Sequence, residues 1–123
     1  MIKIVIDGDP IPAARPRFSG RRYCYCPARD MEYREMIQWQ ARQAMQGAEP
    51  MTCEICAEIK LYRRYRRTAR IYGDVDNHLK AIFDALNGIV IADDAQIIRC
   101  VVSKYTDKER PRAEIEIFSA QGV

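Results

Sequence analysis

The sequence predicts one α+β domain, in which two main helices lie against a single layer of mixed β-sheet in the order β-α-β-α-β-β. Apolar and polar residues alternate in 52–62, which is typical of a strand. Apolar residues recur at helical spacing in 30–46 and 75–86. The length of 123 residues suits a single domain, so we expect residues 1–123 to fold as one unit.

The first half of the chain predicts a strand, an irregular segment and a helix. Residues 2–6 are rich in β-branched side chains, and the following GDPIPAARPR contains three prolines, which favour an extended segment. The helix is predicted to start with Asp30 as its N-cap and to end at Gln46, before Gly47. Its expected buried face consists of Tyr33, Met36, Ile37, Ala41, Ala44 and Met45.

The second half predicts three strands and a second helix. In the strand 52–62 the expected core face is Cys53, Ile55, Ala57, Ile59 and Leu61. The helix Val75–Leu86, ended by Asn87-Gly88, should bury Val75, Leu79, Ile82, Phe83 and Leu86. The last two strands, 96–104 and 113–118, are joined by the charged turn TDKERPR.

The composition predicts a folded cytoplasmic protein. Apolar residues make up 48% and charged residues 30%, and 20 basic against 17 acidic residues give a net charge of +3. No apolar run approaches the roughly 20 residues that a transmembrane helix needs, so we expect no membrane partner. The N-terminus lacks a signal-peptide core, and the five cysteines should stay reduced.

Four carboxylates surround the second helix. Asp74 and Asp76 stand where it begins, and Asp93 and Asp94 follow it. They could be purely structural, because aspartate caps helices, favours the first turn and is common in turns. They could also bind Mg²⁺, which prefers one or two carboxylates together with waters and phosphate oxygens. A third carboxylate could complete such a site if the following strand lies beside the helix.

Lys80 lies four residues after Asp76, one turn further on the same helix face. An exposed ion pair between the two is one interpretation. The other places the ammonium beside a scissile phosphate, where it would stabilise charge in the transition state. The spacing alone leaves both interpretations open.

The spaced motif D-V-D-N-x-x-K-x-x-x-D-A-L, followed by A-D-D-A-Q-I, resembles the RusA family of Holliday-junction endonucleases. Those are small, magnesium-dependent dimers commonly encoded by prophages. The resemblance is sharp over residues 73–104 and extends weakly to G-D-P-I-P-A-A-R-P-R near the N-terminus.

The resemblance implies a RusA-like endonuclease domain over residues 1–123. It implies that Asp74, Asp76 and Asp94 bind Mg²⁺ and that Lys80 is the essential lysine. The implied function is magnesium-dependent resolution of four-way DNA junctions, by paired symmetric nicks, in a homodimer. Two alternatives remain: a metal-dependent nuclease for other branched DNA, and a non-catalytic DNA-binding protein.

Two basic segments predict a DNA-binding surface. RRYRRTAR, residues 63–70, runs directly into the acidic motif and interleaves arginine with Tyr65, after Tyr62. A solvated loop would look similar, but arginines placed there could hold phosphate near a bound cation. The expected DNA-binding residues are Arg15, Arg17, Arg63, Arg64, Arg66, Arg67 and Arg70, with Arg21 and Arg22 in the same N-terminal basic set.

The cysteines and the single histidine favour structural roles. Cys24-x-Cys26 and Cys53-x-x-Cys56 invite a zinc interpretation, but Cys53 and Cys56 should point to opposite faces of their strand. We therefore expect small buried side chains rather than zinc ligands. His78 is expected on the surface of the second helix.

Overall fold

The computed structural model describes residues 1–13, 18–19, 22–23, 27–64 and 75–120. Its elements are, in chain order, β1 (Ile2–Asp7), β2 (Phe18–Ser19), β3 (Arg22–Tyr23), α1 (Pro27–Met45), β4 (Ile55–Arg63), α2 (Val75–Leu86), the 3-10 turn η2 (Asp94–Gln96), β5 (Ile97–Thr106) and β6 (Arg112–Ser119). The predicted order β-α-β-α-β-β is confirmed. The ribbon of β2 and β3 is an addition that the sequence did not predict.

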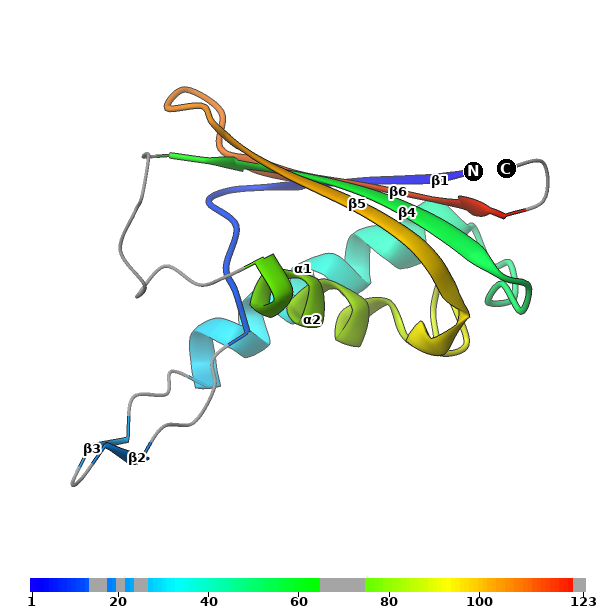
Figure 1. Cartoon of the computed structure of the whole chain (residues 1–123), viewed down its shortest axis with the longest axis horizontal. Helices are drawn as coiled ribbons and strands as arrows, with labels where there is room; N and C mark the ends of the chain where they lie inside the picture. Colours follow the sequence, from blue (N-terminus) through cyan, green and yellow to red (C-terminus); the bar gives the residue numbers. More distant parts are fainter. Residues whose placement is uncertain (14–17, 20–21, 24–26, 65–74, 121–123) are drawn as a thin grey trace.

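The main sheet has the strand order β1-β6-β4-β5. β4 pairs with β5 in parallel and with β6 in antiparallel, and β1 also pairs antiparallel with β6. Both helices lie against one face of this mixed sheet and leave the other face open (Figure 1). The predicted α+β class is therefore confirmed. β5 and β6 are consecutive but not adjacent, because residues 107–111 cross the end of β4, where the Asp107 N–H donates to the Arg63 carbonyl.

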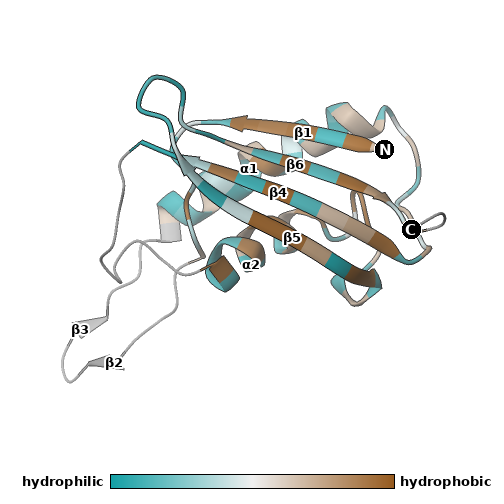
Figure 2. Cartoon of the chain, turned by 45° about the horizontal axis from the view of Figure 1, so that its top comes forward, coloured by the Kyte–Doolittle hydropathy of each residue, from teal (hydrophilic) through white to brown (hydrophobic). Residues whose placement is uncertain are grey.

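The core lies between the sheet and the two helices. Ile4, Ile115 and Ile59 are paired across β1, β6 and β4, and all three are buried. Ile37 of α1 and Ile82 of α2 cover this row from the helix side. Figure 2 shows the period-two alternation of hydropathy along the strands that produces one apolar face. Each fully buried aliphatic side chain contributes about 1.5–3 kcal/mol.

α2 ends at Leu86 as the sequence predicts, and α1 ends at Met45, one residue before the predicted Gln46. Gly47 and Gly88, which follow the two helices, adopt φ of 82° and 84°, a region that favours glycine. The predicted start of α1 is wrong. The helix begins at Pro27, since proline fits the first turn, where a backbone N–H would have no helical partner. Asp30 consequently lies within the first turn rather than at the N-cap.

Several predictions of burial need correction. Ala44 and Cys53 are only half-buried. Met36 is 45% exposed, because it lies on the side of α1 that faces away from the core. His78 is only 3% exposed, so the expected surface position is wrong. Val75 and Leu79 are half-buried. The reason is that α1 packs against α2 in addition to the sheet, which shifts and widens the buried side of α2.

The direction of α2 determines where its ends lie. It connects two parallel strands, β4 and β5, and therefore runs opposite to both. Its first turn lies toward the ends of these strands, and its last turn leads through a short connection to η2 and the start of β5 (Figure 1). Residues that stand on either side of α2 in sequence are thus separated along the length of the helix.

Candidate active site

Two of the predicted catalytic residues lie on α2. Asp76 is exposed in its first turn, and Lys80 follows one turn later with its side chain 59% exposed. The Lys80 ammonium lies 3.2 Å from Oδ2 of Asp84, which is a further turn along the helix. Asp74 falls outside the described residues. The exposed side of α2 therefore presents a carboxylate, an ammonium and a second carboxylate in successive turns.

Asp94 lies in the hydrogen-bonded turn η2. The Asp93 side chain caps this turn by accepting from the Ala95 N–H at 3.3 Å, and the Asp93 N–H donates to Gln96 Oε1 at 2.8 Å. Gln96 Nε2 donates to the carbonyls of Met51 and Cys53, at 2.7 and 2.8 Å. Gln96 thus fixes the turn to the segment before β4, and Asp94 is held in a defined position on the surface.

The neighbouring acids around Asp94 influence its protonation. A hydrogen bond with the Asp93 side chain raises the pKa of Asp94 above its ordinary value, and the charges of Asp93 and Asp84 raise it further. The same hydrogen bond lowers the pKa of Asp93. Lys80 opposes the rise in the pKa of Asp94. Carboxylates this close repel one another, so a bound cation would relieve the repulsion.

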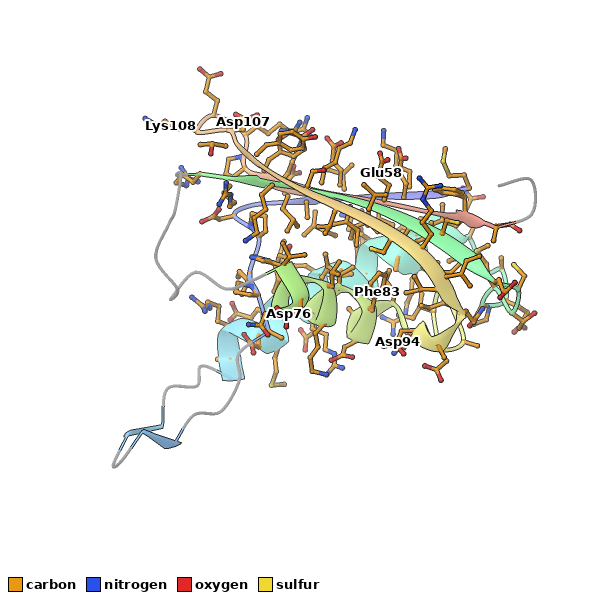
Figure 3. All side chains as sticks on the ribbon, viewed as in Figure 1. Glu58, Asp76, Phe83, Asp94, Asp107 and Lys108 are labelled. Carbon is orange, nitrogen blue, oxygen red and sulfur yellow. The ribbon has the colours of Figure 1, made fainter. Side chains whose placement is uncertain are left out.

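Asp76 and Asp94 lie toward opposite ends of α2. Figure 3 shows Asp76 at the start of the helix and Asp94 in the turn beyond its far end. Within the described part of the chain, no group of three His, Cys, Asp or Glu side chains is arranged to hold a metal ion. The described residues of one chain therefore do not bring the two predicted ligands together, and the place of Asp74 stays a prediction.

The described part of the arginine-rich segment begins in the sheet. The prediction of a loop is wrong for Arg63, which is the last residue of β4 and donates through Nε to the Tyr105 carbonyl at 3.2 Å. The Arg64 N–H donates to Asp9 Oδ1 at 3.0 Å. The other arginines of the predicted DNA surface lie outside the described residues: Arg15, Arg17, Arg21, Arg66, Arg67 and Arg70. Arg22 lies in β3, and its side chain is not described.

Tyr62 and Arg112 form a packed contact at the base of this segment. The Tyr62 ring stacks on Tyr105 with centroids 5.0 Å apart, and the Arg112 guanidinium lies 3.7 Å from the Tyr62 centroid. Arg112 also donates to Glu114 at 2.8 Å and to Asp107 at 3.0 Å. Tyr62 therefore has protein partners for its ring, which argues for a structural role in place of the expected base stacking.

The described cysteines are thiols. Cys53, Cys56 and Cys100 are free, and Cys56 is buried as expected. The Cys53 thiol donates to Ser119 Oγ at 3.8 Å. Cys24 and Cys26 lie outside the described residues.

Two polar residues at the site were not singled out by the sequence reasoning. Asp84 pairs with Lys80, and the spacing of four residues was a usable signal for it. For Gln96 the sequence predicts only the start of a strand. The pattern Asp93-x-x-Gln96 is a capping box, in which the two side chains satisfy each other's backbone groups, and it could have revealed the turn.

The family model described as "Endodeoxyribonuclease RusA" matches residues 7–118, nearly the whole chain. The chain belongs to the RusA endodeoxyribonuclease family. This membership confirms the resemblance and supports DNA nuclease activity. The RusA match includes α2 and η2, so both parts of the candidate site lie within it.

The chain is also similar to a curated bacterial protein over nearly its full length. The chain is 27% identical over 136 aligned positions to the "Uncharacterized protein YqaN" of Bacillus subtilis (strain 168), with 94% of each chain covered. In the described part of this RusA-family chain, no helix has both the length and the apolar character needed to cross a membrane.

Proposed function

We propose that this protein is a magnesium-dependent endonuclease that resolves four-way (Holliday) DNA junctions by paired symmetric nicks. The observation that carries the proposal is the exposed Asp76 and Lys80, one turn apart on α2, in a chain of the RusA family. The family supports DNA cleavage at junctions, and α2 places the Asp76 carboxylate one turn from the exposed ammonium of Lys80, which is paired with Asp84.

The available side chains suit Mg²⁺. Asp76 and Asp94 are exposed carboxylates, and hard oxygen ligands of this kind are what Mg²⁺ prefers. The hydrogen bond with Asp93 is the first cause of the raised pKa of Asp94, and a bound cation would lower that pKa. Asp74, Asp76 and Asp94 are the proposed ligands. When bound, the ion would lower the pKa of a water and neutralise phosphate charge.

Lys80 is the proposed electrostatic catalyst. Its ammonium is exposed and oriented along α2, so a phosphate lying over the helix can approach it. The positive charge would stabilise the additional negative charge that develops on the phosphate oxygens. Asp84, at 3.2 Å, would hold the ammonium in position before DNA arrives. Phosphate contacts from Arg15, Arg17, Arg63, Arg64, Arg66, Arg67 and Arg70 are proposed to hold the substrate.

The separation of Asp76 and Asp94 supports a homodimer with composite sites. β5 is an edge strand of the sheet, and its exposed residues include Ile98, Val101 and Tyr105. Asp94 precedes β5, whereas the start of α2 lies toward the other end of that strand (Figure 3). Two copies paired antiparallel along β5 would therefore place Asp94 of one copy toward Asp76 of the other.

The function is tested with a synthetic mobile four-way junction, incubated with and without Mg²⁺. Paired nicks that require Mg²⁺ are expected, with little cutting of a flap or a plain duplex of the same sequence. Faster cutting of the flap would indicate a nuclease for other branched DNA. Junction binding without any cutting would indicate a non-catalytic DNA-binding protein.

The composite site has its own test. Asp76→Asn and Asp94→Asn proteins should each be inactive alone. A mixed dimer contains one site with both substitutions and one with none, so mixing the two proteins should restore nicking of one strand. If each site is built within one chain, every site in the mixture carries a substitution and no activity returns. Native mass spectrometry of the mixture confirms that subunits have exchanged.

A further inference from the structure

A cleft lies beside Lys80, between the first turns of α1 and the exposed side of α2. Its volume is about 230 Å³, and the segment 11–13 closes one side of it. That segment is fixed in place, because the Ala13 N–H donates to the Asn77 carbonyl of α2 at 3.0 Å. Pockets for drug-sized ligands begin near about 300 Å³, so this cleft suits a smaller ligand such as one ring system.

The lining of the cleft combines apolar surface with a charged rim. Pro12 and Ala81 supply apolar surface, while Asp30 and Arg34 of α1 and Lys80 of α2 supply polar groups. A flat ligand with an apolar face and a polar edge matches this combination. A bare phosphate would meet Asp30 and Asp84, which also line the cleft and would repel it.

Tyr33 gives a second, independent sign of a ligand. Its side chain lines the cleft and is only 4% exposed. The Ile11 backbone lies within reach of its hydroxyl oxygen and acts to lower its pKa, but the O–H has no acceptor among the described residues. Burial raises the pKa of Tyr33 well above its ordinary value, so the hydroxyl remains a neutral donor. A buried donor without an acceptor is costly, and a ligand atom in the cleft would satisfy it.

We propose that this cleft receives one unstacked nucleobase from the DNA strand that is cut. The inference rests on the proposed function, which supplies DNA as the ligand and places the scissile phosphate beside Lys80. Lys80 borders both the cleft and the proposed phosphate position, so the base would belong to a nucleotide next to the scissile bond. Bases at a branch point are the least costly to extract, because their stacking and pairing are already disturbed. The cleft would make cleavage depend on the base at that position.

Fluorescence of 2-aminopurine tests the proposal without any cleavage. The fluorescent base is placed in turn at each position around the branch of a four-way junction, and protein is added in metal-free buffer. One position should show a rise of about threefold or more as its base leaves the stack. Ala81→Leu, which fills the cleft from α2, should abolish that rise at protein concentrations at which a gel shift shows the junction to be fully bound. Gln43→Leu, on an exposed part of α1 outside the cleft, is the matched control and should retain it.

Arg34→Gln provides a second variant that does not depend on packing, since Arg34 is exposed. It should weaken the fluorescence rise without changing the Tm. An abasic nucleotide at the same position should slow wild-type cutting by about tenfold, and should have no added effect in Ala81→Leu. No rise at any position, or an undiminished rise in Ala81→Leu, would overturn the proposal. If the protein shows the rise but never cuts, the proposed nuclease function fails and the base-binding proposal stands. If it binds no junction, both proposals fail.

Discussion

Two groups of charged side chains in this molecule have different surroundings. The Arg112 cluster (Arg112, Asp107, Glu114 and Tyr62) lies at one end of the sheet, and its central cation is only 15% exposed. Arg112 donates to two carboxylates and to the Arg110 carbonyl at 2.9 Å. The α2 cluster (Lys80, Asp84, Asp93 and Asp94) has three carboxylates and one ammonium that is largely exposed, and of these three carboxylates only Asp84 pairs with the ammonium.

The difference separates charge used for folding from charge available for chemistry. In the Arg112 cluster each carboxylate faces a cation, and the pKa values of Glu114 and Asp107 are lowered. In the α2 cluster the acids face one another, and the pKa of Asp94 is raised. Mutations in the two clusters should therefore separate activity from stability.

The largest effect is expected from the aspartates. Asp74→Asn, Asp76→Asn and Asp94→Asn should each lower the rate of junction cutting by more than about 1,000-fold, because each removes a proposed metal ligand. Junction affinity should persist or rise, since a carboxylate repels phosphate when no cation intervenes. Gel shifts and cleavage assays on the same preparations measure both. A variant that cuts at a near wild-type rate would remove its residue from the site.

Lys80→Met should have the next largest effect. Loss of one positioned donor should slow single-turnover cutting by about 100-fold or more, with little change in affinity. Lys80→Arg should restore only part of the rate, because the guanidinium is a wide planar fork. A lysine that serves only as the partner of Asp84 would leave the rate nearly intact. Recovery of Lys80→Met at high Mg²⁺ would assign the lysine to organising the site.

The arginines should affect binding rather than the chemical step. Changing Arg63, Arg64, Arg66 and Arg67 together to Gln should weaken junction binding and make it less sensitive to salt. Each lost phosphate contact reduces the slope of log affinity against log salt by about 0.9. Titrations at several salt concentrations measure the slope. Because Arg63 also bonds to the Tyr105 carbonyl, the Tm must be checked, and an unchanged slope would exclude these residues from the interface.

Arg112→Met should have the smallest effect on cutting and a clear effect on acid stability. The hydrogen bond from Arg112 is the first cause of the lowered pKa of Glu114, whereas the Arg110 N–H is the first cause for Asp107, followed by Arg112. A carboxyl with a lowered pKa stabilises the fold above its unfolded value of about 4, and this contribution is lost as pH falls through the lowered pKa. Between neutral and acid pH, the Tm of Arg112→Met should therefore fall less than the Tm of the wild-type protein. An unchanged profile would contradict the assignment.

Most of the fold could be predicted from local patterns. Ile55, Ala57, Ile59 and Leu61 form the core face of β4 as predicted, because alternation has a single solution when one face is buried. The predicted start of this strand is wrong, since β4 begins at Ile55 and Cys53 lies before it. The bounds of α2 match the prediction, since Val75 begins the apolar spacing and Gly88 ends it. The strand order could not be predicted from local patterns, because the pairing of β4 with both β5 and β6 depends on contacts distant in sequence.

The site was predicted in its members but not in its arrangement. Lys80 and Asp94 were identified from the motif, yet the motif does not tell whether Asp76 and Asp94, at opposite ends of α2, meet within one chain. The burial of His78 was missed because it depends on α1 packing beside α2. Gln96 was missed because its partners, Met51 and Cys53, lie more than forty positions earlier in the chain.

The pairing of β1 with β6 has a consequence for the life of the protein on the ribosome. Ile2 lies opposite Ile117, so β1 is synthesised before the other strands of this sheet and its neighbour β6 after them. At roughly 5–20 residues added per second, β1 spends several seconds without its neighbour while α1, β4 and α2 emerge. The nascent chain therefore cannot complete this sheet until β6 leaves the exit tunnel, so the surface that carries α2 and η2 has no complete sheet behind it before that point.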